Sequence, residues 1–342
     1  MKSNGIKNNK DWINKIVSHQ EGLPVPYNFI LQPPARKKVE KYYETSEIEK
    51  ELDFPIRMNK PTSIKPLYAD PEIFGKTVKD EFGVIWSTNE LDRGAPIGPA
   101  LLAPDLSGYK FPDASAPYRF EGLVDWCENN KEHFTVIWIG DLWERATFMR
   151  SMEALLEDLI LNPNFVEELL GSLTDYILLT MGILFSKCSF DAIAVSDDYG
   201  TQQSLLISPA DWRKFIKPCL ARIYAFAKKH NRLIFHHSCG NVTDIIGDMI
   251  DVGLDILHPI QPEAMDIINL KKEFGSDLTF CGGIGTQKLL PRGTVDEIQT
   301  DIRRLKDRMG NGGGYILEPG ITVQGDVPLE NLIAMINEAR NI

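Results

Sequence analysis

The chain has 342 residues, of which 43% are hydrophobic and 25% charged, and its formal net charge is −11. This length is normal for one α/β barrel, which often exceeds about 250 residues, and it is sufficient to bury a full core. The acidic balance argues against nucleic acid or an anionic membrane surface as the main partner. We therefore expect a single domain over residues 1–342.

The cysteine content and the apolar runs bear on the compartment. The five cysteines are odd in number and show no tight framework spacing, which is typical of reduced thiols in a cytoplasmic protein. The stretch Met1 to Gly5 has no apolar run, so no signal peptide is predicted. The longest apolar run, Tyr176 to Phe185, is too short to cross a bilayer and predicts a buried helix.

The first 130 residues give few regular patterns. Residues Pro26 to Ile30 predict one strand. A second strand is expected within residues 60–105, where Pro and Gly are frequent, and Phe82 to Trp86 is either that strand or half of a hairpin.

From about Glu132 onward, short β-branched runs alternate with amphipathic segments. This rhythm predicts a parallel sheet covered by helices. We interpret it as an α/β fold, a (β/α)8 TIM barrel with an N-terminal extension and an irregular segment around residues 60–105. An open doubly wound sheet competes, but no Gly-rich phosphate turn follows the first strand. The predicted strands cover 135–139, 192–195, 233–235, 256–258, 278–280 and 315–317. The predicted helices cover 143–188, 211–229, 242–252, a short stretch around Leu270, 295–308 and 328–340.

Candidate metal ligands follow the predicted strands. The carboxyl ends of barrel strands converge on one mouth, so side chains just past each strand meet there. Thiolate, imidazole and carboxylate are ligands that suit zinc, and long gaps between ligands are normal for a catalytic site. His237 and Cys239 follow one strand two positions apart, and Cys281 and Glu318 follow later strands. These four residues are the predicted ligands of a catalytic zinc ion.

Each predicted ligand has a structural alternative. Cys281 is equally interpreted as a small packing residue beneath a glycine turn, and His258 as a core histidine. His236 faces away from His237 if the strand continues through both, because side chains alternate along a strand. We therefore expect only one of these two adjacent histidines to bind metal.

Acid–base and substrate-binding residues are predicted at two other strand ends. Of the adjacent pair Asp197 and Asp198, only one side chain enters the mouth, and we favour Asp198 as a catalytic acid, with Asp197 capping a turn. Glu144 is a second candidate acid. The remaining side chains are predicted to contact substrate, against the alternatives that the charged ones complement a helix dipole and the aromatic ones belong to the core: Asp141, Arg145, Trp143 and Tyr199.

From about Gly140 to its end the sequence resembles the uroporphyrinogen decarboxylase superfamily, whose members have a TIM-barrel fold. The segments that carry the resemblance are 140–145 (GDLWER), 197–202 (DDYGTQ), 237–241 (HSCGN), 259–262 (PIQP), 282–284 (GGI) and 328–331 (PLEN). The true decarboxylases bind a substrate with many carboxylates through several arginines in an N-terminal segment. The matching stretch, residues 31–36, keeps only Arg36, and this acidic chain is not expected to supply a group of cations.

The other branch of the superfamily contains the cobalamin-dependent methyltransferases, which bind zinc through a His-x-Cys motif and a later cysteine. His237-Ser238-Cys239 matches the motif, but the later cysteine would align near Ile321 and is absent. The resemblance then implies that Glu318 or Cys281 replaces it, and that the enzyme resembles relatives that demethylate methoxylated compounds.

The predicted function follows from that branch. A methyl group moves from a methoxylated, aromatic donor to the Co(I) corrinoid of a partner protein, with zinc as the Lewis acid. No Asp-x-His-x-x-Gly corrinoid motif occurs in the chain, so the corrinoid is expected from a corrinoid protein. Three alternatives remain: a metal-free decarboxylase, methyl transfer from a methylated corrinoid to a thiol, and a non-catalytic barrel that binds a tetrapyrrole or corrinoid. Neither nucleic acid nor a membrane is an expected partner.

Overall fold

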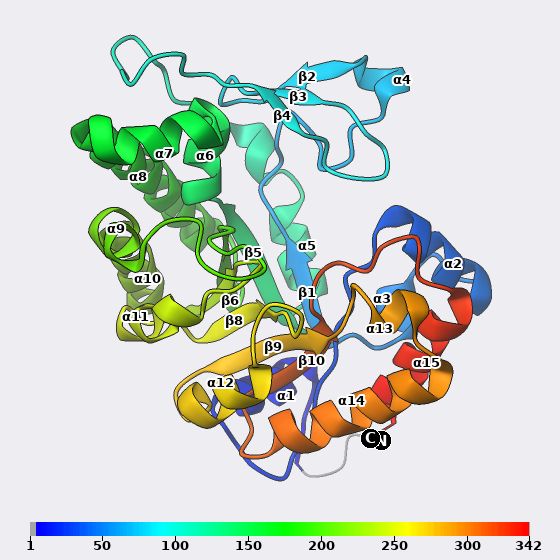
Figure 1. Ribbon diagram of the computed structural model, residues 1–342. Helices are drawn as coiled ribbons and strands as arrows, with labels where there is room; N and C mark the ends of the chain where they lie inside the picture. Colours follow the sequence, from blue (N-terminus) through cyan, green and yellow to red (C-terminus); the bar gives the residue numbers. More distant parts are fainter. Residues whose placement is uncertain (1–4, 342) are drawn as a thin grey trace.

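The computed structural model describes residues 5–341 (Figure 1). The prediction of no signal peptide rests on Met1 to Gly5, and residues 1–4 lie outside the described part. The main sheet has seven strands in the order β1-β5-β6-β7-β8-β9-β10, and every neighbouring pair is parallel. Its strands are β1 (Ile56–Asn59), β5 (Phe134–Gly140), β6 (Ala192–Ser196), β7 (Leu233–His237), β8 (Ile256–Ile260), β9 (Thr279–Ile284) and β10 (Tyr315–Pro319).

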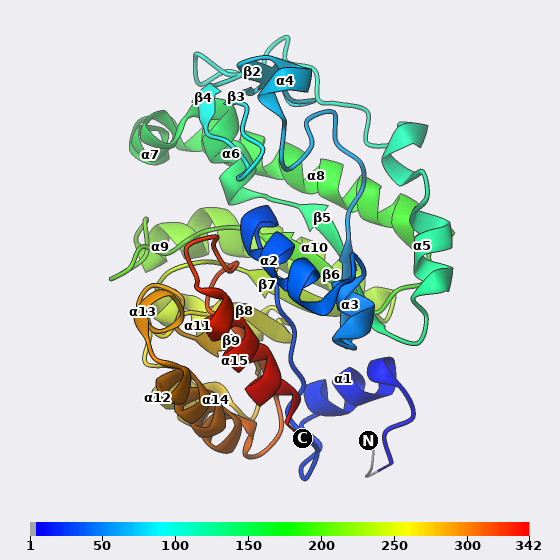
Figure 2. The same ribbon diagram turned by 90° about the vertical axis from the view of Figure 1, so that its right-hand side faces the viewer.

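The sheet curls, and helices cover its outer face (Figures 1 and 2). The helices follow the predicted rhythm, with apolar residues at helical spacing turned inward. The helix from Val295 shows this pattern: it begins with a capping box between Thr294 and Glu297, and it buries Ile298, Ile302, Leu305 and Met309. The helices are α1 (Asn9–Val17), α2 (Pro33–Tyr43), α3 (Ile48–Glu51), α4 (Pro71–Phe74), η1 (Pro117–Phe120), α5 (Leu123–Asn129), α6 (Trp143–Arg150), α7 (Met152–Leu161), α8 (Pro163–Lys187), α9 (Pro209–Asp211), η2 (Trp212–Ile216), α10 (Lys217–Lys229), η3 (Thr243–Ile245), α11 (Ile246–Asp251), α12 (Ile267–Phe274), α13 (Leu289–Arg292), α14 (Val295–Gly310) and α15 (Leu329–Arg340).

The predicted parallel α/β architecture is confirmed, but the closed eight-stranded barrel is not: within the described residues the main sheet is a curled sheet of seven strands. The segment around Pro26–Ile30 is no strand of the sheet, but it runs parallel to β10 through isolated bridges from Tyr27 to Leu317 and from Leu31 to Val323. The strand expected from residues 60–105 does not join the main sheet. The first strand is instead β1, which pairs with β5 and lies before that segment.

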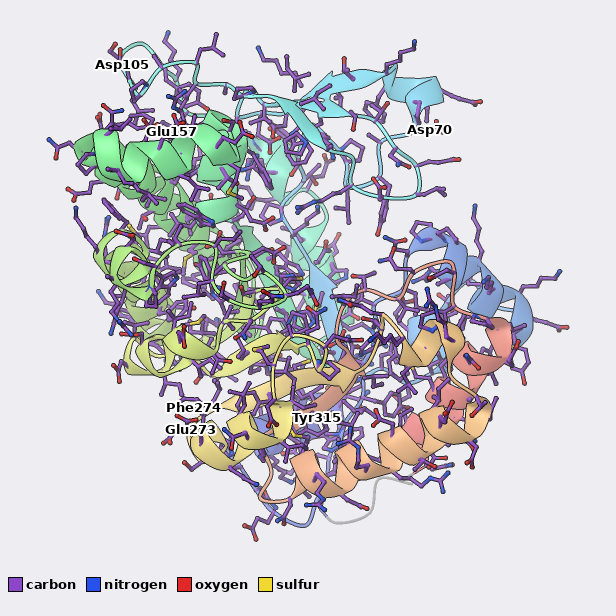
Figure 3. The ribbon with its side chains drawn as sticks, viewed as in Figure 1. Asp70, Asp105, Glu157, Glu273, Phe274 and Tyr315 are labelled. Atoms are coloured by element: carbon purple, nitrogen blue, oxygen red, sulfur yellow. The ribbon has the colours of Figure 1, made fainter. Side chains whose placement is uncertain are left out.

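Residues 60–120 form a unit that we call the cap segment. It contains a separate antiparallel sheet of β2 (Thr77–Lys79), β3 (Ile85–Ser87) and β4 (Pro96–Gly98), so the hairpin interpretation of Phe82 to Trp86 is close to the observed β2–β3 pair. In both views the cap segment lies at one end of the molecule beside α6 and α8 (Figures 1 and 2). Asp70 and Asp105 stand on opposite sides of it, far from Tyr315 of β10 (Figure 3).

The buried carboxylate of Asp80 ties the cap segment together and to the main domain. It accepts hydrogen bonds from the backbone of Phe82 at 3.0 Å, the backbone of Val84 at 2.9 Å and the Trp86 indole at 2.9 Å. It also forms an ion pair of 2.8 Å with Arg145 of α6. Because a buried charge is stable only with such partners, Asp80 fixes the β2–β3 turn against α6.

The apolar run Tyr176 to Phe185 belongs to α8, which has 25 residues. Among residues 5–341, α8 is the one helix long and apolar enough to cross a membrane by length and composition. The apolar run alone is too short to do so. Half of its most apolar window is buried, and the helix packs against α7, α10 and β5. These contacts are those of a core helix, as predicted.

Candidate functional site

Asp198, His237 and Cys239 form a half-exposed cluster that we call the open group. The Nε2 atom of His237 lies 3.4 Å from the Cys239 sulfur and 3.5 Å from Asp198 Oδ1. Zinc bonds of about 2.0–2.3 Å in a tetrahedron place neighbouring ligand atoms roughly 3.3–3.8 Å apart. The open group therefore has the donor types and the spacing of three zinc ligands.

Two glycines hold the strand ends that carry the open group against each other. Gly200 follows β6, and a Cβ there would meet the backbone of Asn241 at 2.6 Å. Gly240 follows β7 with φ of +78°, and a Cβ there would meet the backbone of Gly200 at 2.5 Å. Only glycine permits this approach, because it lacks a Cβ and adopts positive φ without strain. The contact sets Asp198 beside Cys239, whose backbone N–H donates to Asp198 Oδ1 at 2.9 Å.

His258, Cys281 and Glu318 form a second cluster, the buried group, on the neighbouring strands β8, β9 and β10. The Cys281 thiol donates to Glu318 Oε2 at 2.9 Å, and His258 Nε2 lies 3.7 Å from the same oxygen. The other carboxylate oxygen accepts a bond of 3.4 Å from the amide of Asn28. All four side chains are at most 5% exposed, so these groups satisfy one another away from water.

His237 connects the two groups, because its Nδ1 atom lies 2.9 Å from Nδ1 of His258. The four residues predicted as ligands of one ion are thereby divided: His237 and Cys239 belong to the open group, and Cys281 and Glu318 to the buried group. His258, for which the sequence leaves a core position as the alternative, is the member of the buried group that contacts His237. His236 points to the helix layer, where its Nδ1 lies 2.7 Å from the Tyr224 hydroxyl and its ring stacks on Tyr199.

The two groups differ in charge. In the buried group burial raises the pKa of Glu318 to about 7, raises the pKa of the Cys281 thiol and lowers the pKa of His258, so all three side chains favour their neutral forms. In the open group burial opposes charge as well, but hydrogen bonding to His237 holds the pKa of Asp198 below its usual value. Burial likewise acts against the His237 cation, yet Cys239 and Asp198 raise its pKa. The contacts within the open group thus favour the charged forms of Asp198 and His237, unlike those of the buried group.

Asp197 has the structural role that was considered for it. Its Oδ1 atom accepts the backbone N–H groups of Leu142 at 2.9 Å and Glu144 at 3.0 Å, which caps the start of α6. Its Oδ2 atom accepts the Tyr199 hydroxyl at 2.9 Å. This leaves Asp198 as the member of the pair beside His237.

Glu144, at the start of α6, is the carboxyl group whose surroundings best fit an acid. Burial, followed by repulsion from Asp198, raises its pKa to about 7. It is only 6% exposed, forms an ion pair of 3.1 Å with Arg93 of the cap segment, and accepts a bond of 3.3 Å from Ser196. A carboxyl group with this pKa carries a proton in much of the protein at neutral pH, which suits a general acid.

A cavity of about 580 Å³ lies between the main sheet and the cap segment. His237, His258, Glu318 and Glu144 line it, and so do two predicted substrate-binding residues, Asp141 and Arg145, which pair with each other at 3.4 Å. Its apolar lining includes five aromatic side chains, which are common in sites that bind small organic molecules: Trp138, Trp86, Phe82, Phe148 and Tyr176.

Trp143 and Tyr199, which were predicted to bind substrate, do not line this cavity. Both side chains are fully buried. Trp143 is the first residue of α6, and Tyr199 donates its hydroxyl to Asp197 as described above. Their aromatic rings fill the space between the sheet and its helices. Their position corresponds to the core alternative and places neither ring within reach of a molecule in the cavity.

The expectation that the chain supplies no group of cations was wrong. Five basic side chains line the cavity, although only Arg145 had been considered. Three of them are neutralised: Arg145 by Asp80 and Asp141, Arg119 by Glu81 at 3.3 Å, and Arg93 by Glu144. The other two are Lys60 and Lys65.

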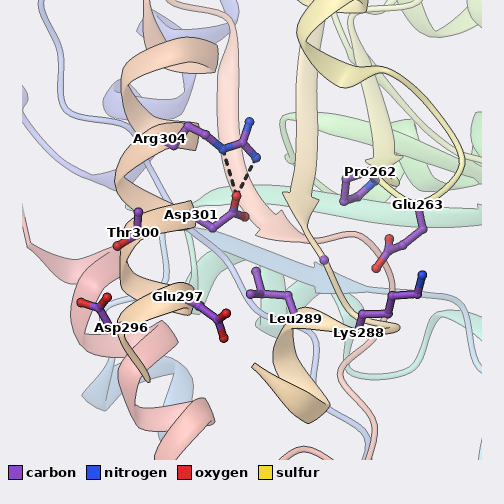
Figure 4. Close-up of a pocket in the computed structure, with 10 residues that line it drawn as sticks. Pro262, Glu263, Lys288, Leu289, Asp296, Glu297, Thr300, Asp301 and Arg304 are labelled. Atoms are coloured by element: carbon purple, nitrogen blue, oxygen red, sulfur yellow. Dashed lines mark hydrogen bonds and ion pairs between the residues drawn. The ribbon is translucent and has the colours of Figure 1, made fainter. Parts of the chain in front are cut away.

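A second hollow of about 530 Å³ lies on the outside, between α14 and the loops after β8 and β9 (Figure 4). Asp296, Asp301 and Arg304 extend from α14, and Glu263 and Lys288 face them. Arg304 is already bonded to Asp301 at 2.6 Å. Neither the open group nor the buried group lines this outer hollow. We therefore place the chemistry in the inner cavity.

Sequence reasoning missed the residues contributed from the first 131 positions. Lys60, Lys65, Asp80 and Arg93 lie in segments without a clear repeating pattern, so the sequence carries no signal of their place near the mouth, and Asn28 lies in a predicted strand but was not singled out. His258 did have a signal, because it ends the predicted strand 256–258, just as His237 follows the predicted strand 233–235.

The uroporphyrinogen decarboxylase (URO-D) family model matches residues 132–342. The chain belongs to this family. A methylcobamide:CoM methyltransferase, MtaA of Methanosarcina barkeri, is 29% identical over 146 residues, which are 43% of this chain. The same enzyme of the Fusaro strain is 27% identical over 146 residues. The chain thus spans about 40% of the length of these curated relatives.

Among solved structures, a methyltransferase from Methanosarcina mazei superposes with a TM-score of 0.74 at 19% identity. The match covers 97% of this chain and 98% of that one, so it includes the cap segment and shows a shared fold. The predicted membership of the superfamily, and the resemblance to its methyltransferase branch, are confirmed.

Proposed function

We propose that the chain is a zinc-dependent methyltransferase that moves a methyl group from a methoxylated aromatic donor to the Co(I) corrinoid of a partner protein. The observation that carries the proposal is the position of His237, which belongs both to the open group and to the lining of the aromatic cavity. A donor molecule in that cavity lies next to thiol, imidazole and carboxylate groups at zinc spacing.

His237, Cys239 and Asp198 are the residues that would hold Zn²⁺. When bound, the ion supplies a Lewis acid that polarises the ether oxygen of the donor. The buried group then has a supporting role: His237 donates from Nδ1 to His258, and His258 from Nε2 toward Glu318. Metal-bound histidines commonly have such a partner, which fixes the ring orientation. Cys281 and Glu318, first predicted as ligands, become the end of this chain of contacts.

The transfer needs a proton as well as a methyl acceptor. The bond between the methyl carbon and the ether oxygen breaks, its electron pair stays on the oxygen, and the methyl group is accepted by the corrinoid of the partner. Glu144 in its acid form supplies the proton to that oxygen, and its raised pKa keeps the proton available near pH 7. The aromatic lining, with Trp138 5.9 Å from the His237 ring, holds the ring of the donor.

A second candidate function has one specific observation in its favour. Both curated relatives are methylcobamide:CoM methyltransferases, so the reverse direction, from a methylated corrinoid to a thiol, is the alternative. The same open group would bind the thiol. An assay in both directions separates the two functions: a methoxyaromatic with Co(I) cobalamin, and methylcobalamin with a thiol, each followed by the cobalamin absorbance.

The test of the proposal combines metal analysis with that assay. We expect one Zn²⁺ per chain and methyl transfer from a methoxyaromatic donor. Cys239→Ala should lose both. Cys219→Ala is the matched control, because Cys219 is a buried thiol bonded to the Phe215 carbonyl and lies outside the cavity lining. Absence of bound metal in the wild-type protein, or unchanged zinc in Cys239→Ala, would contradict the proposal.

A further inference from the structure

The ion pairs inside the cavity leave two positive charges without a carboxylate. The arginines are each paired, as described above, whereas no ion pair is found for Lys60 or Lys65 among residues 5–341. Both lysines line the cavity, and both belong to the cap segment. Asp141 and Glu81 attract Lys60 and Asp80 attracts Lys65, but none of these carboxylates forms an ion pair with either lysine within the described residues, so both ammonium groups keep hydrogen-bonding capacity for a ligand.

Lys65 is held in place by neutral groups. Its ammonium donates to the backbone carbonyls of Pro66 at 3.1 Å and Arg93 at 2.8 Å, and lies 4.8 Å from the centre of the Trp86 ring. An ammonium group has three N–H donors, so one remains for a further acceptor. The carbonyls and the ring orient the charge without neutralising it.

Lys60 has all three donors free of hydrogen bonds to residues 5–341, and it is close enough to Lys65 for their charges to repel. Burial lowers the pKa of Lys60, and burial together with the Lys60 charge lowers the pKa of Lys65. Two like charges facing one space disfavour each other, and an anion between them removes that cost.

We propose that Lys60 and Lys65 bind an anionic group of the substrate, so that the molecule taken by this site is a small methyl-carrying organic anion such as a methoxyaromatic carboxylate. This inference rests on the proposed function for the identity of the reacting end. The anionic end is held by the cap segment and the aromatic body by Trp86 and its neighbours, while the methoxy group faces His237.

The location of the lysines indicates that they determine specificity. The family model covers residues 132–342, which include the open and buried groups but neither lysine. The chemistry therefore comes from the part of the chain shared with the family, and the anion contact from the part outside that match. A contact distant from the reacting atoms affects binding of the donor before it affects the chemical step.

The test is a calorimetric titration of the zinc-loaded protein, which needs no methyl transfer. The probes are 3-methoxybenzoate and its neutral counterpart 3-methoxybenzamide. We expect the acid to bind at least about tenfold more tightly than the amide, since hydrogen bonds to charged groups contribute about 1.5–3 kcal/mol. Lys60→Met and Lys65→Met should each weaken binding of the acid by about tenfold and leave the amide unchanged.

Lys76→Met is the matched control, because Lys76 is an exposed lysine of the same segment outside the cavity lining. Thermal unfolding of each variant verifies that it is folded. A third probe, ethanesulfonate, distinguishes a carboxylate site from a sulfonate site: tighter binding of the sulfonate assigns the anion to an alkyl acceptor instead of an aromatic donor. Equal affinities for acid and amide, or no binding of any anionic probe to the wild-type protein, would overturn the proposal. Anion binding that depends on the lysines in a protein inactive in methyl transfer would retain the anion site and reject the proposed function.

Discussion

The cavity has two walls of different origin, one from the carboxyl ends of the main strands and one from the cap segment. The sheet wall carries His237, His258 and Glu318, side chains that bind metal or move protons. The cap wall carries the basic side chains Lys60, Lys65 and Arg93. The comparison teaches that, in the function proposed above, the regular part of the fold would supply the reactive groups and the irregular part the contacts that select a substrate.

The largest effect is expected from His237→Ala on the sheet wall. This side chain faces Cys239 through one ring nitrogen and His258 through the other, so its loss separates the open group from the buried group. We expect zinc to fall well below one ion per chain and methyl transfer to fall to background, measured by metal analysis and the corrinoid absorbance.

Cys281→Ala sharpens that result. If the open group holds the ion, this variant keeps one zinc per chain, because Cys281 contacts only Glu318 among the candidate ligands. Loss of zinc in Cys281→Ala would make Cys281 a ligand, as the sequence predicts.

The second effect concerns Glu144, which is positioned between the two walls by Arg93. Because its acid form is the active one and its pKa is about 7, the rate should fall as pH rises above 7. Glu144→Gln should reduce methyl transfer by about 10²–10⁴-fold and abolish this part of the pH profile. Unchanged pH dependence in the variant would exclude Glu144 as the acid.

Glu144 also affects the pH dependence of the free energy of unfolding, in the opposite direction from most carboxylates. Its pKa in the folded protein is raised above the ordinary value of 4.5 to about 7, so the folded state binds more protons between these pH values. The free energy of unfolding contributed by Glu144 therefore decreases as pH rises from about 4.5 to 7, by about 3 kcal/mol in total. Urea unfolding of the chelator-treated protein should show this slope, and Glu144→Gln should remove it.

The sheet wall could be predicted from the sequence, and the cap wall could not. Alternation of β-branched runs and amphipathic helices placed His237, Cys239, Cys281 and Glu318 at strand ends, because the carboxyl ends of parallel strands share one edge. How those four residues divide into two groups depends on distances of a few ångströms, which a periodic pattern does not contain. The same limit explains why Trp143 was predicted to bind substrate: its side chain follows a strand end but points beneath it.

The cap segment has only a short periodic stretch, in which Phe82, Val84 and Trp86 are buried in alternation. Its turn is held by one buried carboxylate, Asp80, which accepts from these three nearby residues and pairs with Arg145 of α6. Nothing in the sequence distinguishes Asp80 from the other acidic residues. The arrangement of the cap wall depends on tertiary contacts and could not be predicted from the sequence.

A further prediction tests whether Asp80 holds the cap segment together. Asp80→Ala removes the acceptor for two backbone N–H groups and for Trp86, and it leaves Arg145 without its closest partner. Breaking a buried ion pair in this way costs about 3–5 kcal/mol. Hydrogen exchange should show a loss of protection of that size in β2 and β3, with the strands of the main sheet unaffected. Asp105→Ala is the matched control, since the Asp105 side chain is exposed and, within residues 5–341, bonds only to Ser107; equal loss in both variants would show that Asp80 does not hold the segment.

The smallest effect is expected on the far side of β7, where His236 faces the helix layer instead of the cavity. Tyr224→Phe removes the hydroxyl that lies 2.7 Å from His236 Nδ1 and leaves that buried nitrogen without a partner. The expected loss is about 1–2 kcal/mol of unfolding free energy. Zinc content and methyl transfer should not change, because adjacent residues of a strand face opposite sides and only His237 reaches the open group. Tyr118→Phe, at an exposed tyrosine, should change neither stability nor metal content. A loss of zinc in Tyr224→Phe would mean that the helix-facing side of β7 contributes to the metal site, and the division between reactive and supporting side chains along this strand would then have to be redrawn.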